Sequence, residues 1–407
     1  MNKDIVFIAS NFPVVSQTFV VSNVVEAIKK GYKVQVLTSR LYDVAQSSQS
    51  DIISTYKVMN STSCFTEPVK KSVRYKMALK HLLDVKMLYY FIKYILIKKD
   101  KISLSDIFLL QYYKPYRNAK VFHVHFANAA TLIINLKKIG FIKSKIIVTF
   151  HGYDAFFKDD LEKKALRKKY NLLFNVVDKV TINTPYLKEM VIELGCPQKL
   201  LVTIAVGIDT MYYLPEIHPK TIIENATVQL ISIGRLIELK GHKYGILATK
   251  ELIDKGYDIH YTIIGEGNLF KELAQLIKDL KLDNHITLFG KGTQEEVKTA
   301  LENATIFLMT SVADSSGRQE TQGIVTAEAQ AMGLPVVGFN SGGVPYTVTD
   351  ETSILVSQKN VNELAKELEY LIIHKANYRS MSLEARNWAL QQFDISNMVN
   401  AYYDDIL

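Results

Sequence analysis

Glu320 and Glu328, two glutamates separated by seven residues, are the most informative pair of side chains in this 407-residue chain. Gly323 lies between them, where a helix is expected to begin, and Glu328 falls one to two turns into that helix. The free backbone N–H groups of a helix start suit a phosphate. Ionised carboxylates only accept hydrogen bonds, so they suit the hydroxyl donors of a ribose and a sugar. A site that holds both phosphate and polyol is a nucleotide-sugar site.

Two cations, Arg235 and Lys240, follow the first strand expected in the second half of the chain. With the N–H groups of Gly323 and Ile324 they suit a nucleoside diphosphate. Each charge-assisted hydrogen bond would contribute roughly 1.5–3 kcal/mol. The alternative is that both cations are ordinary surface residues.

These residues belong to longer motifs. The run from Glu320 and Glu328 into Ala-Met-Gly-Leu-Pro-Val-Val, with Ser-Gly-Gly-Val-Pro at residues 341–345, resembles the donor-site signature of retaining GT-B glycosyltransferases of family 4. The turn Gly234-Arg-Leu-x3-Lys240-Gly resembles the diphosphate-binding turn of that family, which favours the binding role for both cations.

Further motifs follow in the order found in the family. The segment 12–19 is similar to a subgroup found in bacterial exopolysaccharide, O-antigen and colanic acid assembly. The resemblance covers nearly the whole chain apart from an insertion around residues 43–117. The remaining matches lie at residues 149–154, 195–197, 207–209 and 265–267.

The resemblance implies an α/β chain with the GT-B fold, in which two Rossmann-like, doubly wound domains face each other across a cleft. It assigns Glu328 to the ribose hydroxyls and Glu320 to the transferred sugar. Otherwise, Glu328 would be a helix-surface carboxylate, and Glu320 a solvated loop residue or a charge that favours a helix start. The implied donor-binding residues are Ser16, Gly234, Arg235, Lys240, Gly265, Gly290, Lys291, Gly323, Ile324, Val325 and Glu328, and the implied catalytic residues are His151, Arg235, Lys240 and Glu320.

The acceptor side is expected in the first half of the chain. His151 opens a loop after a buried strand, and such sheets bind ligands at the carboxyl ends of their strands. By resemblance, His151 contacts the donor or positions the acceptor, and Asp154 orients His151 or contacts the acceptor hydroxyl; a satisfied interior imidazole and a helix cap are the alternatives. His125 and Thr18 are the other acceptor-side candidates. His123 and His125 point to one face of a strand, but no third ligand has the spacing of a metal site.

Three features limit the chemistry. Many relatives have Gly-Gly after the first strand where this chain has Val-Val-Ser-Gln at residues 14–17, which puts a close backbone contact with the donor in question. Gly265-x-Gly267 imitates a dinucleotide fingerprint, but Phe270 replaces the third glycine, which argues against NAD. The chain has no Asp-x-Asp, the pair with which glycosyltransferases of the other main fold hold a metal ion. We therefore expect activity without a metal ion or cofactor.

The expected elements alternate strand and helix, as in a doubly wound parallel sheet. First-half strands are expected at residues 4–10, 33–39, 121–126, 145–150, 179–183 and 201–205, with helices at 17–30, 129–139, 161–176 and 185–194. The pattern then restarts. Second-half strands are expected at residues 229–234, 260–265, 286–289, 305–310, 335–339 and 353–356, with helices at 242–255, 269–280, 293–303, 323–332 and 361–373.

This restart predicts two domains. Residues 1–210 should form an acceptor-side domain with a helical insertion at about 43–117, and residues 227–385 a nucleotide-sugar-binding domain. Residues 211–226, with two prolines and little periodicity, are predicted to link them. The tail is predicted to contain two helices with a break near residues 393–394. The resemblance implies that residues 386–407 pack back on the first domain.

Composition limits the classes of molecule that this chain is expected to bind. A net charge of +8 and a pI near 9.0 permit an anionic substrate, an anionic membrane surface or nucleic acid. The basic residues accompany no helix-turn-helix, RNP-like or zinc pattern, so nucleic acid is not expected. Cys64 and Cys196 lie too far apart in the sequence for a metal-binding or redox motif. A reducing cytosol is the simplest compartment for such a chain. The basic, aromatic-rich segment 69–116 indicates either contact with an anionic membrane or a helical insertion packed on its domain.

The expected function is transfer of a sugar from a nucleoside-diphosphate donor, a UDP-sugar being favoured, to a hydroxyl of a growing, lipid-linked surface glycan. The family resemblance implies retention of anomeric configuration. The expected location is the cytoplasm, peripheral on the inner face of the plasma membrane. The alternatives are a sugar-nucleotide epimerase or phosphorylase on the same fold, and a catalytically silent relative that binds glycan or lipid as an assembly partner.

Overall fold

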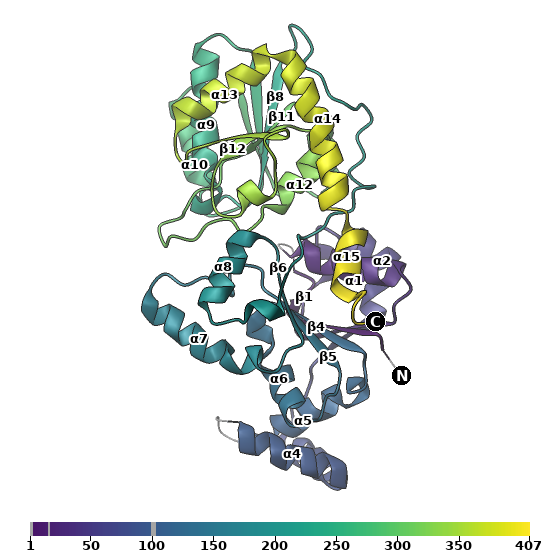
Figure 1. Cartoon of the computed structure of the whole chain (residues 1–407). Helices are drawn as coiled ribbons and strands as arrows, with labels where there is room; N and C mark the ends of the chain where they lie inside the picture. The colour runs from purple at the N-terminus through teal and green to yellow at the C-terminus, as the bar shows by residue number, and fades with distance from the viewer. Residues whose placement is uncertain (1–2, 15–16, 99–102) are drawn as a thin grey trace. The chain divides into compact units, whose positions relative to one another are not determined.

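The computed structural model describes residues 3–14, 17–98 and 103–407, and the chain divides into two compact units. Each unit contains one parallel sheet covered by helices (Figure 1). Unit 1 comprises Met1–Ile182, Lys188–Ile204 and Val399–Leu407, and unit 2 comprises Asn183–Leu187 and Ala205–Met398.

The sheet of unit 1 has the order β3-β2-β1-β4-β5-β6-β7, and every pairing is parallel. This is the order of a doubly wound sheet, in which the strand sequence reverses between β1 and β4. The strands are β1 (Ile5–Phe12), β2 (Val34–Leu41), β3 (Thr62–Cys64), β4 (Val121–His125), β5 (Lys145–Thr149), β6 (Lys179–Ile182) and β7 (Leu201–Thr203).

The sheet of unit 2 repeats the scheme in the order β10-β9-β8-β11-β12-β13, again parallel throughout. Its reversal point lies between β8 and β11. The strands are β8 (Val228–Ile233), β9 (Ile259–Ile264), β10 (Ile286–Gly290), β11 (Ile306–Met309), β12 (Val336–Phe339) and β13 (Ser353–Val356).

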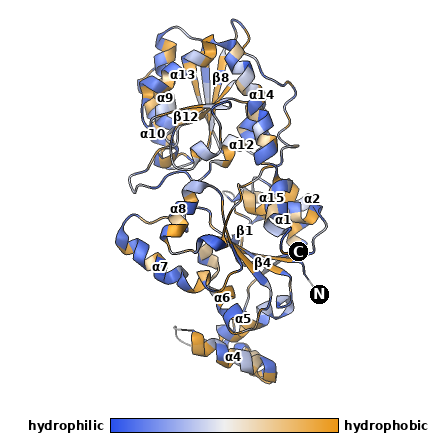
Figure 2. Cartoon of the chain, viewed as in Figure 1, coloured by the Kyte–Doolittle hydropathy of each residue, from blue (hydrophilic) through white to orange (hydrophobic). Residues whose placement is uncertain are grey.

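Helices follow most strands and are predominantly amphipathic, whereas the strands are hydrophobic (Figure 2). Buried parallel strands bury both faces, which explains this difference. The first-half helices are α1 (Thr18–Lys29), α2 (Ser50–Thr55), α3 (Lys71–Leu82), α4 (Val85–Ile97), α5 (Ser105–Tyr113), α6 (Thr131–Lys138), α7 (Asp160–Phe174) and α8 (Pro185–Glu193). The second-half helices are α9 (His242–Asp254), α10 (Phe270–Asp279), α11 (Gln294–Asn303), α12 (Ile324–Ala331), α13 (Val361–Ile373), α14 (Lys375–Gln392) and α15 (Ile395–Tyr403).

The core of unit 2 shows how the strands divide their side chains. Val228 and Leu230 of β8 pack in a cluster with α9, α10 and α13, whereas Ile231 packs in a second cluster with α11, α12 and α14. Successive strand residues face opposite sides, so one strand serves both helical layers. These layers fix the carboxyl ends of the strands, where a site is expected.

All strands and helices predicted for the two halves are present, with ends that differ by a few residues. The insertion at 43–117 was predicted as helical only, which is wrong at one point. Residues Thr62–Cys64 form the edge strand β3, paired with β2. This strand is short and lacks an apolar run, and it exists through its pairing with β2.

The tail contains α14 and α15, with the break near residues 393–394 confirmed. The last part of the chain, Val399–Leu407, lies in unit 1. There the Tyr403 hydroxyl lies 2.6 Å from Nδ1 of His123, and the Lys179 ammonium pairs with Asp405. These polar contacts, of which the one with His123 is buried, attach the chain end to β4 and β6.

Candidate functional site

The carboxyl ends of β8, β9 and β10 carry three of the predicted donor-binding glycines. The N–H of Gly234 donates to the carbonyl of Ile264 (2.9 Å), and the N–H of Gly265 donates to the carbonyl of Gly290 (2.8 Å). Gly265 has a φ of +153°, and a Cβ there would lie 1.9 Å from the carbonyl oxygen of Gly234. Only glycine allows this approach. The three turns are thus held together at the edge where doubly wound sheets bind ligands.

Lys240 ends a short 3-10 turn between β8 and α9. The hydroxyl of Thr310, just beyond β11, donates to the carbonyl of Lys240 (3.1 Å). A Cβ on Gly241 would lie 2.0 Å from the carbonyl oxygen of Thr310. Because β8 and β11 flank the point of strand reversal, these contacts hold Lys240 at that point.

The ammonium of Lys240 forms an ion pair with the carboxylate of Glu320. The two side chains are 15% and 16% exposed, so the pair is shielded but still accessible. Burial alone would raise the pKa of Glu320, but the positive charges of Lys240 and Arg235 hold this pKa below its usual value. Glu320 is therefore ionised at neutral pH and can accept hydrogen bonds from hydroxyls.

The loop after β12 fixes the backbone around Glu320. The N–H of Gly343 donates to the carbonyl of Glu320 (2.7 Å), and the N–H of Gly342 donates to the side-chain oxygen of Gln319 (2.8 Å). A Cβ on Gly343 would lie 1.9 Å from the carbonyl oxygen of Thr321. The Ser-Gly-Gly motif thus sets the position of the Glu320 carboxylate.

Helix α12 begins directly after this segment. Gly323 precedes it with a φ of +79°, and Ile324 and Val325 form its first positions. The N–H groups of a first turn have no partner within their own helix, which is the arrangement that binds phosphate. The buried hydroxyl of Thr326, in the same turn, lacks a hydrogen-bond partner within the described parts of the chain.

Glu328 lies further along α12 beside a residue that the sequence analysis missed. Burial raises the pKa of Glu328 to about 7, and a hydrogen bond with the hydroxyl of Tyr213 opposes this rise. Tyr213 is itself only 3% exposed. The pair Tyr212-Tyr213 in an otherwise irregular segment is the sequence signal that could have identified it.

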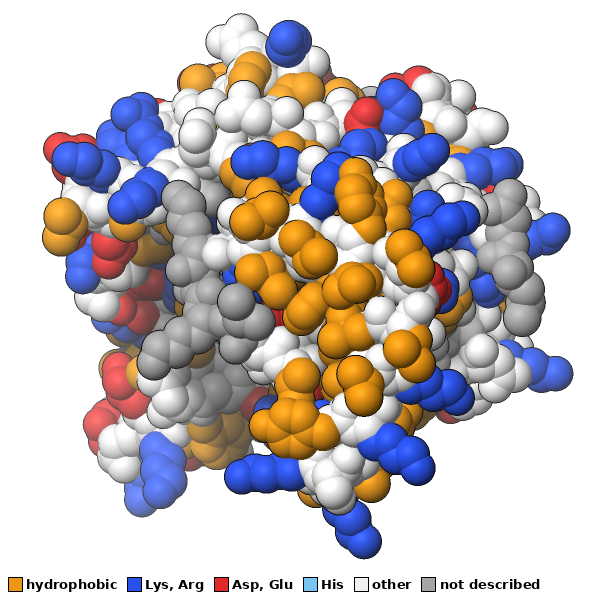
Figure 3. All heavy atoms as spheres, turned by 90° about the horizontal axis from the view of Figure 1, so that it is seen from below, with side chains coloured by type: hydrophobic (Ala, Val, Ile, Leu, Met, Phe, Trp, Pro, Cys, Tyr) orange, Lys and Arg blue, Asp and Glu red, His pale blue; other side chains and the backbone are white. Residues whose placement is uncertain are grey.

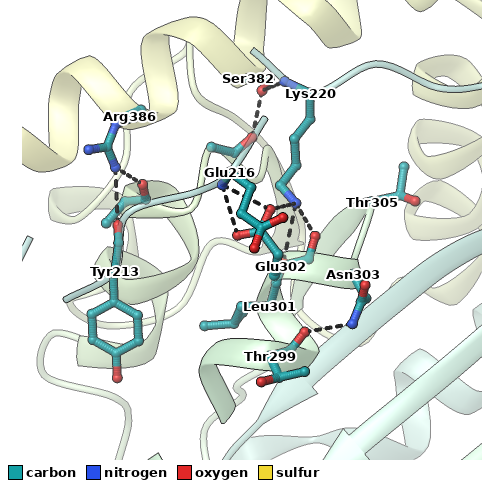
Figure 4. A network of polar contacts seen from close by, with 12 residues as sticks. Tyr213, Glu216, Lys220, Thr299, Leu301, Glu302, Asn303, Thr305, Ser382 and Arg386 are labelled. Carbon is teal, nitrogen blue, oxygen red and sulfur yellow. Dashed lines mark hydrogen bonds and ion pairs between the residues drawn. The ribbon is translucent and has the colours of Figure 1, made fainter. Parts of the chain in front are cut away.

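Tyr213 is held in place by polar contacts along the segment that precedes β8 (Figure 4). Arg386 of α14 donates to the carbonyl of Tyr213 (3.1 Å) and to that of Ala331, at the end of α12. The N–H of Lys220 donates to the hydroxyl of Ser382 (2.8 Å), and its ammonium donates to the carbonyl of Leu301 near the end of α11. This irregular segment is therefore fastened to unit 2 and presents Tyr213 to Glu328.

Two further predicted donor residues, Arg235 and Lys291, are exposed just beyond β8 and β10. Arg235 is close enough to Glu320 to lower the pKa of that carboxyl. Within unit 2, the cations Arg235 and Lys240 thus lie near the Glu320 carboxylate. Glu328 lies beside the Tyr213 hydroxyl. Direct contact of each residue with a donor stays a prediction.

In unit 1, His125 ends β4 and His151 follows β5. Nδ1 of His125 lies 3.1 Å from Nε2 of His151, and the rings stack with centroids 5.3 Å apart. His123 lies behind them, 2.7 Å from the Thr149 hydroxyl. The structure thus adds His151 as the third imidazole that sequence spacing did not reveal. Within the described ranges, however, no three His, Cys, Asp or Glu side chains are arranged to hold a metal ion.

Burial keeps these imidazoles neutral. It lowers the pKa of His125 to about 3 and the pKa values of His123 and His151 well below the usual value. A neutral imidazole donates from one nitrogen and accepts at the other. The hydrogen bond between His125 and His151 therefore fixes one nitrogen of each ring.

Asp154 is almost completely buried and organises the loop around His151. One carboxylate oxygen accepts from the N–H groups of His151 (3.0 Å) and Gly152 (3.1 Å), and the other accepts from the N–H of Ala127 (2.7 Å). Burial raises the pKa of Asp154 to about 6, and these hydrogen bonds oppose the rise. The carboxylate thus ties the loop after β4 to the loop after β5, while its contact with an acceptor stays a prediction.

Two further predicted residues follow β1 in the sequence. Thr18 begins α1, and the neighbouring Phe19 ring packs on His151 with centroids 4.4 Å apart. Ser16 lies outside the described residues.

Solved structures identify the fold class. Anabaena HepE in complex with UDP superimposes with a TM-score of 0.73 at 17% identity, covering 100% of this chain and 99% of that one. A glycosyltransferase from Rickettsia africae gives a TM-score of 0.71 at 17% identity and covers 100% and 98%. Together with the two Rossmann-like sheets, these similarities define the GT-B fold.

Sequence comparison identifies the family. The family model Glycosyltransferase Family 4 matches residues 17–212, and the model Glycosyl transferases group 1 matches residues 215–388. The chain therefore belongs to the family 4 glycosyltransferases.

Two relatives come from polysaccharide biosynthesis. The amylovoran biosynthesis glycosyltransferase AmsK of Erwinia amylovora is 28% identical over 85% of each chain. The WcaL protein of Escherichia coli K12, whose name assigns it to colanic acid biosynthesis, is 30% identical over 62% of this chain and 61% of its own length.

Proposed function

We propose that this glycosyltransferase moves a sugar from a UDP-sugar to a hydroxyl of a growing, lipid-linked exopolysaccharide, with retention of anomeric configuration and without a metal ion. The observation that carries the donor half of this proposal is the Lys240–Glu320 ion pair. It joins a cation suited to a diphosphate to a carboxylate suited to a sugar hydroxyl, between the segments that follow β8 and β11.

The donor occupies this edge as follows. Its diphosphate lies against Arg235, Lys240 and the first N–H groups of α12, which together offset the phosphate charge. Its ribose hydroxyls donate to Glu328, and the transferred sugar donates to Glu320. HepE, whose fold this chain shares, was crystallised with UDP, and this supports uracil as the base.

The chemistry uses the leaving diphosphate. The bond between the anomeric carbon and the phosphate oxygen breaks, and the acceptor oxygen bonds to that carbon from the same face. The proton of the acceptor hydroxyl passes to the departing phosphate oxygen. Arg235 and Lys240 stabilise the charge that develops there, the same role that fixed donors play at other developing anions.

Glu320 is better suited to hold the sugar than to attack it. In the proposed complex its carboxylate accepts hydrogen bonds from sugar hydroxyls, and these bonds weaken it as a nucleophile. The neutral His151 adds a hydrogen-bonding group at the carboxyl edge of the other sheet, and we assign it to positioning of the sugar or acceptor. Asp154 keeps the His151 loop in place.

The acceptor assignment rests on the relatives. AmsK and WcaL carry names from amylovoran and colanic acid biosynthesis, which supports a glycan acceptor. The lipid link of that glycan is proposed from the family resemblance alone. The proposed location is cytoplasmic, on the inner face of the plasma membrane. No helix in the described ranges has the length and apolarity to cross a bilayer.

Variants of the two cations test the donor half. Arg235→Ala and Lys240→Ala should weaken UDP binding and reduce kcat at least tenfold each, because each charge-assisted bond contributes about 1.5–3 kcal/mol. Lys243→Ala, an exposed cation on the adjacent helix, is the matched control. Unchanged turnover in both test variants would end the leaving-group assignment.

A thermal-shift screen with UDP, GDP, ADP and their sugars identifies the base. NMR of the product then reports its anomeric configuration. Consumption of donor without any acceptor would indicate an epimerase, and failure to bind any nucleotide sugar would indicate a silent relative.

A further inference from the structure

Helix α4 presents an apolar face to solvent. The spacing of these residues by three or four positions places them on one side of the helix. The buried residues Met87 and Tyr94 lie on the opposite side, toward the body of unit 1. The exposed residues are Val85, Leu88, Tyr89, Ile92 and Leu96, with exposed fractions from 38% to 79%.

Helix α3 packs against α4 and carries further exposed apolar residues, with Val73 and Met77 on one side of the helix and Tyr75 and Leu79 on the other. The resulting patch is continuous over this end of unit 1 in the space-filling view (Figure 3). We refer to it as the α3–α4 face. Exposed apolar patches of this extent mark an interaction surface. The additional exposed residues are Val69, Val73, Tyr75, Met77, Leu79 and Leu83.

Basic side chains surround the α3–α4 face (Figure 3). The only acid between residues 69 and 97 is Asp84, and it is already paired with Lys114 (2.9 Å). The basic residues of this segment are Lys70, Lys71, Arg74, Lys76, Lys80, Lys86 and Lys93.

We propose that the α3–α4 face docks on an anionic phospholipid surface, with the apolar stripe among the acyl chains and the lysines at the headgroups. An interfacial helix shows this combination of an apolar face and flanking cations. A second copy of the chain is a poorer occupant, because pairing two such faces would bring their lysines together. The proposed function supports the choice of a membrane only through its lipid-linked acceptor. The apolar face and its flanking cations are observed independently of that function.

The α3–α4 face is separate from the acceptor-side histidines. Tyr113 of α5 packs on Phe122 near the start of β4, and Tyr90 of α4 packs on Phe141 in the loop that leads into β5. The helical insertion therefore covers the amino ends of the strands, whereas His125 ends β4 at the carboxyl edge. Docking anchors the protein and does not itself bind the reacting hydroxyl.

Sedimentation of the full chain with vesicles tests this surface. Vesicles of phosphatidylcholine alone are compared with vesicles containing phosphatidylglycerol. Binding to the anionic vesicles should fall about fivefold for each of Lys76→Gln, Lys80→Gln and Lys86→Gln. It should fall about tenfold for Leu83→Ser and for Leu96→Ser.

Helix α7 supplies matched controls. Leu161 is 79% exposed, against 78% for Leu96, and Lys164 and Lys168 are exposed as well. Leu161→Ser, Lys164→Gln and Lys168→Gln should bind vesicles as the unaltered chain does. Equal losses in test and control variants, or equal binding to the two kinds of vesicle, would overturn the proposal.

Two further measurements separate the possible failures. A solution dimer that disappears in Leu96→Ser would overturn the lipid assignment in favour of a second copy. UDP binding should be the same in all of these variants. If the unaltered chain bound anionic vesicles but no nucleotide, the proposed function would fail and the lipid-binding surface would remain.

Discussion

Protonation of the Glu328 carboxyl should change the affinity for a nucleotide sugar within an accessible pH range. Burial raises the pKa of this carboxyl to about 7, and the hydrogen bond with Tyr213 opposes the rise. In the proposed site the ribose hydroxyls donate to the ionised carboxylate, so the donor competes with a proton. Nucleotide-sugar affinity should therefore fall as the pH drops through about 7.

The size of the effect follows from the pKa. About one tenth of the carboxyl is ionised one pH unit below its pKa, and about nine tenths one unit above. The dissociation constant should thus increase about tenfold from pH 8 to pH 6, or by about 1.4 kcal/mol. Isothermal titration calorimetry with UDP-glucose measures it well, because a diphosphate esterified at both ends has no acid that ionises near neutral pH.

Variants assign the slope to Glu328. Glu328→Gln should bind more weakly at pH 8 and lose the pH dependence. Tyr213→Phe removes the bond that lowers the pKa of Glu328, so its midpoint should move to higher pH. Tyr212→Phe is the control, since that hydroxyl contacts Glu295 instead (2.8 Å). A slope that persists in Glu328→Gln would refute the reasoning and direct attention to Asp154, whose pKa is raised to about 6.

Three other changes have defined outcomes. Glu328→Gln should raise the melting temperature relative to the unaltered chain at pH 8 but not at pH 4: a carboxyl with a raised folded pKa costs stability as the pH rises from its usual value through about 7. Tyr403→Phe should lower the urea midpoint by the equivalent of about 1–3 kcal/mol, because a buried nitrogen of His123 loses its partner, whereas the exposed Tyr346→Phe should not. Gly343→Ala should weaken UDP-sugar binding at least tenfold, because its Cβ collides with the carbonyl of Thr321; unchanged affinity would show that this loop does not position Glu320.

The sequence was sufficient for most of the fold because buried parallel strands read as short runs of Val and Ile. The strand β11 and the helix α9 illustrate this, since one is an apolar run and the other begins directly after a glycine. The strand β3 has neither signal. Thr62–Cys64 is polar and short, and its strand conformation depends on β2, which is distant in sequence.

The candidate site was predictable where it depends on short motifs and not where it depends on contacts between them. Lys240 and Glu320 were each predicted, but their ion pair joins positions 80 residues apart. Tyr213 gave a weaker signal because its placement depends on Arg386, in α14. Burial, which sets the pKa of Glu328, likewise arises only when α12 packs against the rest of unit 2.

The Lys240–Glu320 pair suggests how the donor edge can be both stable and ready to bind. An unpaired charge in a shielded site would cost several kcal/mol, so each group serves as the partner of the other when no donor is present. A nucleotide sugar offers both replacements at once: phosphate oxygens for the lysine and a sugar hydroxyl for the glutamate. A free nucleoside diphosphate offers only the first and leaves Glu320 without its cation. On this reasoning, UDP-sugar should bind more tightly than UDP in the unaltered chain, and Glu320→Gln should abolish that preference; equal affinities of UDP and UDP-sugar in the unaltered chain would contradict it.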